Sequence, residues 1–80
     1  MQVKKSKQVR KYLDRQNSET RERLESALDD LPSGDVIPIV NMPNTFRLRV
    51  GKYRAIFVYD DDIIKVTVLN VRGQVYKKGR

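Results

Sequence analysis

Residues 46–69 read FRLRVGKYRAIFVYDDDIIKVTVL, and this stretch decides the fold. From Phe46 onward, apolar and basic side chains alternate with a period of two, which is the pattern of a β-strand with one buried face. Gly51 and Lys52 fit a two-residue hairpin turn with glycine at its first central position. This turn predicts three cross-strand pairs: Val50 with Tyr53, Arg49 with Arg54, and Leu48 with Ala55.

A second turn centred on Asp61 and Asp62 leads into a third strand. It predicts the pairs Tyr59–Ile64, Phe57–Val66 and Ala55–Val68. One face of the meander is then apolar and should be the core: Phe46, Leu48, Val50, Tyr53, Ala55, Phe57, Tyr59, Ile64, Val66 and Val68. The register leaves Asn70 on the core side, a conflict that a bulge or strand end near Val71 would remove.

The first half of the chain predicts a very short strand at Val3 and two helices. Ser6 is the expected N-cap of the first helix, and Ser18 that of the second. Apolar residues follow helical spacing in both: Val9, Tyr12 and Leu13, then Leu24, Ala27, Leu28 and Leu31. We therefore expect an α+β fold, a single domain over residues 1–80, in which an antiparallel two-helix hairpin packs on one face of a twisted antiparallel meander. Residues 35–45 should be an ordered connection with an edge-strand fragment around Ile39 and Val40.

The net charge of +7 is unevenly distributed. Residues 1–15 carry +5, residues 16–45 carry −4, and residues 46–80 carry +6. This asymmetry indicates a polyanionic partner such as nucleic acid, although charge alone fits a soluble domain kept monodisperse equally well. The chain has no Cys and no His, which excludes disulfides and thiol or histidine catalysis. No apolar run follows the basic N-terminus, so we expect a cytoplasmic protein without a membrane span.

The expected sheet face away from the helices carries Arg47, Arg49 and Arg54 as one basic surface. Like charges directly opposite on paired strands are destabilising, and no strand carboxylate is expected to neutralise them. The pattern favours a phosphate-binding platform, with a merely solvated basic face as the alternative. Three successive acids, Asp60 to Asp62, are interpreted as turn formers rather than metal ligands.

The segments FRLRVGKYRAIFVYDDD and IIKVTVLNVRGQVYK together resemble the core of the RelE/ParE toxins, and VKKSKQVRKYL resembles the first strand and helix of that family. The resemblance implies a type II toxin that a cognate antitoxin neutralises. For RelE-like members it implies cleavage of messenger RNA in the ribosomal A site, without metal or cofactor. The alternatives are a ParE-like gyrase inhibitor and a non-catalytic nucleic-acid-binding or decayed toxin.

The resemblance also assigns roles to Arg47, Arg49, Arg54, Arg72 and Tyr76, and the basic residues around them complete the expected site. The expected catalytic set is Arg54, Arg72 and Tyr76, and the expected RNA-binding set is Arg47, Arg49, Lys52, Lys65 and Lys77. Two departures bear on proton transfer. Arginines replace the lysine pair of well-known cleaving members, and no histidine precedes the tail, where the chain reads Asn70-Val71-Arg72. Because arginine does not give up its proton, the phenol of Tyr76 is the expected proton-transfer group.

Overall fold

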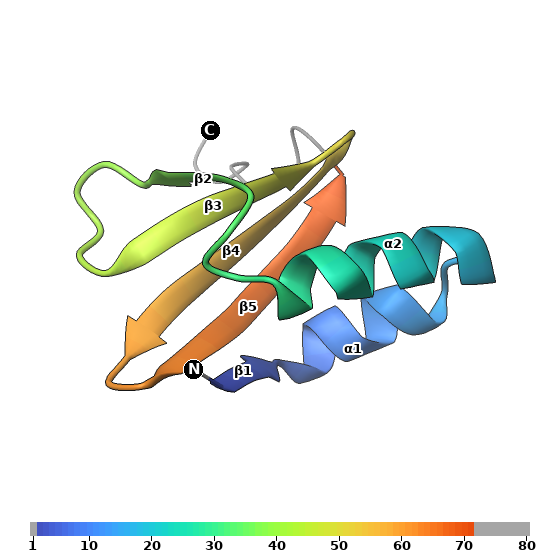
Figure 1. The fold of residues 1–80 in the computed structure, drawn as a ribbon, viewed down its shortest axis with the longest axis horizontal. Coiled ribbons are helices and arrows are strands. Elements are labelled where there is room, and N and C mark those ends of the chain that lie inside the picture. The colour runs from blue at the N-terminus through green and yellow to red at the C-terminus, as the bar shows by residue number, and fades with distance from the viewer. Residues whose placement is uncertain (1, 72–80) are drawn as a thin grey trace.

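Two helices cover one face of a five-stranded sheet in the computed structural model, which describes residues 2–71 (Figure 1). The elements in chain order are β1 (Gln2–Lys5), α1 (Lys7–Asp14), α2 (Ser18–Asp29), β2 (Asp35–Pro38), β3 (Thr45–Val50), β4 (Tyr53–Asp60) and β5 (Ile63–Val71). The strand order is β1-β5-β4-β3-β2. Strand β1 runs parallel to β5 and the other pairs are antiparallel, so the expected α+β fold is confirmed with a mixed sheet. No helix in this part of the chain is long and apolar enough to span a membrane.

The core lies between the helices and the sheet. Both predicted helix stripes face it, and the most buried residues are Val9, Leu13, Leu24, Leu28, Leu48, Ala55, Phe57, Ile64, Val66 and Leu69. Ser6 caps α1 as predicted, because its hydroxyl accepts the Val9 N–H at 3.2 Å. The prediction for α2 was wrong by one residue: Asn17 is the cap, and its side chain accepts the Thr20 N–H at 2.8 Å.

The β3–β4 hairpin has the predicted register throughout. Gly51 adopts a φ of 59° at the first central position of its turn, a conformation that glycine reaches without strain. Alternation therefore directs the arginines of this hairpin to the face away from the helices, called the outer face below.

Strand β5 departs from the predicted register at Thr67. The pairs Tyr59–Ile64 and Phe57–Val66 are confirmed, but Ile56 then pairs with Val68, and Thr67 is left without a partner. The expected pair of Ala55 with Val68 is therefore wrong, since Ala55 pairs with Leu69. This bulge buries Leu69 and moves Asn70 to the outer face, and it lies four residues before the place near Val71 where we expected it.

The N-terminus of α1 holds the bulged part of β5. Strand β1 ends at the pair Lys5–Val66, so within residues 2–71 the edge of β5 beyond Val66 has no neighbouring strand. The Ser6 hydroxyl donates to the Thr67 carbonyl at 3.0 Å. The Gln8 amide then donates to the Leu69 carbonyl at 3.1 Å and accepts the Leu69 N–H at 3.0 Å. Two side chains thus continue the ladder where β1 stops.

Strand β2 forms the opposite edge of the sheet. It spans Asp35–Pro38, earlier than the fragment expected around Ile39 and Val40, because only this segment pairs with β3. The Ile39 N–H donates to the Thr45 carbonyl at 3.0 Å and closes the ladder. The Val36 N–H donates to the Gly34 carbonyl at 3.0 Å, and Pro38 has no N–H to donate.

Candidate functional site

Four polar side chains form one row across the outer face. Asn70 on β5 is in register with Arg54 on β4, Arg54 with Arg49 on β3, and Arg49 with Asp35 on β2. Directly opposed residues on paired strands have Cβ atoms about 4.5–5.5 Å apart, so each member of the row can touch the next. Arg47 lies one pleat away from Arg49, between Ile37 and Ile56. The outer face therefore gathers three guanidinium groups, as predicted.

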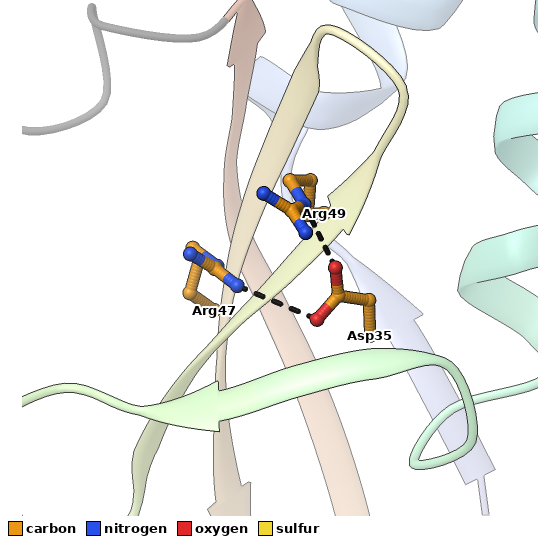
Figure 2. A network of polar contacts seen from close by, with 3 residues as sticks. All are labelled: Asp35, Arg47 and Arg49. Atoms are coloured by element: carbon orange, nitrogen blue, oxygen red, sulfur yellow. Dashed lines mark hydrogen bonds and ion pairs between the residues drawn. The ribbon is translucent and has the colours of Figure 1, made fainter.

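A single carboxylate bridges two of these arginines (Figure 2). Asp35 accepts a hydrogen bond from Arg49 Nε at 2.7 Å through Oδ2, and its Oδ1 lies 3.6 Å from Arg47 Nη2. The expectation that no strand carboxylate neutralises the arginines is therefore wrong. It failed because it placed the edge-strand fragment at Ile39 and Val40, beyond Asp35. One carboxylate shared by two guanidiniums leaves the cluster with a net positive charge.

The arginines of the cluster differ in their surroundings. The Arg47 side chain is only 10% exposed, whereas that of Arg49 is 50% exposed. Among residues 2–71, the buried Nε atoms of Arg47 and Arg54 have no hydrogen-bond acceptor. A guanidinium offers five N–H donors, and leaving buried donors unmatched is costly. Such a cluster suits a ligand rich in anionic oxygens, above all phosphate.

The two expected RNA-binding lysines of the sheet lie apart from this cluster. Lys52 places its ammonium 5.6 Å from the ring centroid of Tyr53, a core residue on the helix side. The guanidinium of Arg23 on α2 lies against Gly51 in the same turn. Lys65 is on the outer face, but its ammonium is 2.8 Å from the Asp60 carboxylate. That hydrogen bond and the positive charge lower the pKa of Asp60.

Three of the four tyrosines lie on the helix side of the sheet. The rings of Tyr12 and Tyr53 meet edge to face at 6.3 Å, and Tyr59 packs against Phe46 and Phe57. Burial raises the pKa of Tyr12, and the neighbouring Tyr53 raises it further. None of these phenols shares the outer face with the arginines. The fourth, Tyr76, lies outside the described residues, as do Arg72 and Lys77.

The acidic turn has the geometry of a turn former. Asp61 adopts a φ of 56°, in the left-handed region that aspartate tolerates better than most residues. Within the described part of the chain, no group of three potential ligands comes together to hold a metal ion.

Sequence reasoning missed Asp35, Asn70 and Arg23. The sequence did give a warning at Asn70, because the predicted register put its polar amide into the core. That conflict indicated that the register of β5 had to shift before this residue. Asp35 and Arg23 carried none, since each reaches its partners through contacts between segments that no short-range pattern specifies.

No protein-family profile matches the chain, and no curated protein matches it by sequence. Solved structures match its fold over nearly its whole length, including two complexes of RelE with RelB. One is the RelB–RelE antitoxin–toxin complex from Methanococcus jannaschii, with a TM-score of 0.76 and 22% identity over 92% of this chain and 95% of that chain. The other is the archaeal RelE–RelB complex from Pyrococcus horikoshii OT3, with a TM-score of 0.72 and 30% identity over 91% and 96%.

Proposed function

The chain belongs to the RelE-like family of toxins, and from this premise we propose that it is a ribosome-dependent endoribonuclease that cleaves messenger RNA without a metal ion. The observation that carries the proposal is the cluster of Arg47, Arg49 and Arg54 on the outer face. A single carboxylate, that of Asp35, pairs with this cluster among residues 2–71. Guanidiniums hold phosphate in fixed geometry, and the negatively charged backbone of RNA supplies acceptors for the N–H groups that remain exposed on this face.

The proposed reaction is attack by a ribose 2′-hydroxyl on its adjacent phosphorus. The 2′-oxygen–phosphorus bond forms as the bond from phosphorus to the 5′-oxygen breaks, which leaves a cyclic phosphate and a 5′-hydroxyl. The proton of the 2′-hydroxyl passes to the catalytic base, and the departing 5′-oxygen takes a proton from an acid or from water. The requirements are in-line positioning and stabilisation of the charge on the phosphorane, and both are within reach of arginines.

The residues take distinct roles in this proposal. Arg47 and Arg49 hold the RNA backbone, with Lys52, Lys65 and Lys77 as further contacts. Arg54 and Arg72 stabilise the charge that develops around phosphorus. Tyr76 transfers the proton, and the location of the other three tyrosines on the helix side supports this choice. A phenol titrates near 10 on its own, and a cationic group close to a phenol favours its ionised form.

A cognate antitoxin is the proposed protein partner. Both similar structures are complexes of RelE with RelB. An antitoxin that brings carboxylates to the arginine cluster would occupy the positions that phosphate takes in RNA. Expression of this chain alone should therefore stop growth, and co-expression of the antitoxin should restore it.

The decisive experiment separates RNA cleavage from gyrase inhibition. Primer extension on RNA from induced cells should reveal new 5′ ends within coding frames, while gyrase supercoiling stays intact. Single-turnover cleavage on programmed ribosomes should then fall by about 10²–10⁴ in Tyr76→Phe and about 10²–10³ in Arg72→Ala, with ribosome binding retained. Arg49→Ala should weaken binding as well. Gyrase inhibition without new RNA ends would contradict the proposal, and Tyr76→Phe cleaving within a few-fold of the parent would contradict the role of Tyr76.

A further inference from the structure

We propose that Asn70 contacts the RNA directly, as the neutral end of the arginine row, and donates its side-chain amide to an oxygen of the RNA backbone. The proposal rests on the function proposed above and adds one residue to its binding site. Asn70 is in register with Arg54, which is in register with Arg49. A nucleotide whose phosphate contacts these two arginines therefore lies within reach of the Asn70 side chain.

The bulge at Thr67 is what brings Asn70 to this face. In the regular register of β5, Asn70 would point into the core and Leu69 would point outward. The shift reverses both residues, burying Leu69 to 1% exposure and setting Asn70 beside Arg54. Bulges are frequent next to active sites, where they redirect a side chain. Asparagine is also among the residues that are depleted in strands, so its own preference does not explain its place here.

Three hydrogen bonds from the start of α1 maintain the shifted register. Ser6 holds the Thr67 carbonyl, and Gln8 holds both backbone groups of Leu69. The Thr67 hydroxyl also donates to the Ile56 carbonyl across the bulge at 3.3 Å. Leu69, the residue immediately before Asn70, is therefore held in place by the start of α1. A side chain that must meet its ligand in one geometry needs such support from its surroundings.

The chemistry of the amide complements that of the arginines. The Oδ1 of Asn70 accepts the Val71 N–H at 3.3 Å, which orients the amide and leaves its two Nδ2 hydrogens as donors. A neutral donor beside two cations adds a directed hydrogen bond without adding charge. The contact should therefore strengthen RNA binding without changing its dependence on salt.

Single-turnover cleavage on programmed ribosomes, measured at several salt concentrations, tests the proposal. Asn70→Ala should raise the half-saturating toxin concentration about 10- to 150-fold, the range expected for one lost hydrogen bond to a charged group, with an unchanged salt slope. Asn70→Asp, which has the same shape but lacks the donors and repels phosphate, should lose more than Asn70→Ala. Arg54→Ala should instead reduce the salt slope by about 0.7, the value for one phosphate contact on a single strand.

Gln2→Ala is the matched control, because it removes an exposed amide from β1 that pairs at the far end of β5, beside Ile63. It should behave as the parent does. Thermal unfolding of each variant reports whether the fold is intact. An Asn70→Ala protein that cleaves with the parent's half-saturation would overturn the role of Asn70, as would tighter binding by Asn70→Asp. A parent protein that cleaves no RNA would instead overturn the proposed function itself.

Discussion

The side-chain amide of Gln8 pairs with both backbone polar groups of Leu69, donating to its carbonyl at 3.1 Å and accepting its N–H at 3.0 Å. A residue of α1 thereby makes the two hydrogen bonds that a neighbouring strand would make. The pairing begins where β1 ends, so helix and strand together cover this edge of β5. It also links the first helix to the strand that carries Asn70.

Gln8→Ala should lower the free energy of unfolding by about 1–3 kcal/mol, since it leaves a part-buried N–H and carbonyl of Leu69 without partners. Urea unfolding measures this change. Lys7→Ala, at the exposed neighbouring position on α1, is the control and should stay within about 0.5 kcal/mol of the parent. Equal stability of the two variants would show that water replaces the amide at no cost.

Asp35→Asn should increase the affinity for RNA, because it removes the carboxylate that pairs with Arg47 and Arg49 and would compete with phosphate for them. The salt slope of binding should become steeper by up to about 0.7. The cost in stability should be about 1–3 kcal/mol, since the pair with Arg49 is about half exposed but the Arg47 side chain, only 10% exposed, loses its charged partner. Asp14→Asn, on α1, makes the same change in charge away from the arginines and should have little effect. Weaker binding by Asp35→Asn would mean that the carboxylate chiefly positions the arginines.

Gly51→Ala should destabilise the fold by about 1–2 kcal/mol, because its φ of 59° disfavours any residue with a Cβ. The added Cβ would also meet the guanidinium of Arg23, which must move aside. Gly51→Asn should cost less, since asparagine tolerates this conformation. Chemical denaturation of the three proteins gives the comparison. If alanine and asparagine cost the same, contact with Arg23 rather than backbone conformation dominates.

Tyr12→Phe should flatten the loss of stability at alkaline pH. Burial and the neighbouring Tyr53 raise the pKa of Tyr12 above its usual value of about 10, so the folded state holds the phenol proton more tightly than the unfolded state does. This contribution is fully present below pH 10 and is lost as pH rises through the raised pKa. Urea unfolding between pH 8 and 11 measures it. Parallel curves for the two proteins across this range would contradict the prediction.

The hairpin of β3 and β4 could be predicted residue by residue, because shifting it by one position would bury the arginines and because Gly51 fixes the turn. The same reasoning failed in β5. Residues 66–69 read VTVL, and apolar side chains stand at both parities there, so the hydrophobic pattern does not locate the shift. The bonds from Ser6 and Gln8 that hold it come from a segment about sixty residues away.

The candidate site could likewise be predicted only in part. Arg47, Arg49 and Arg54 share the outer face because strand alternation places them there. The counter-charge from Asp35 depends on how β2 aligns with β3, across an intervening segment that holds a second proline and no steady period. Lys65 lies on the outer face, as alternation predicts, but the local contacts of Lys65 and Lys52 could not be predicted. Their long side chains turn toward local partners, Tyr53 and Asp60, which parity does not specify.

The outer edge of β2 presents carbonyl oxygens with almost no donors beside them. Of the two residues that alternation turns outward, Val36 has already given its N–H to Gly34, and Pro38 has none to give. A strand that approached this edge would find almost no N–H donors for its own carbonyl groups. Edge-to-edge association of free copies of the toxin into larger sheets is therefore disfavoured. The sequence Val36-Ile37-Pro38 thus reduces the tendency to aggregate. This matters because the large apolar side chains of Ile37, Val40 and Met42 are exposed near the same edge.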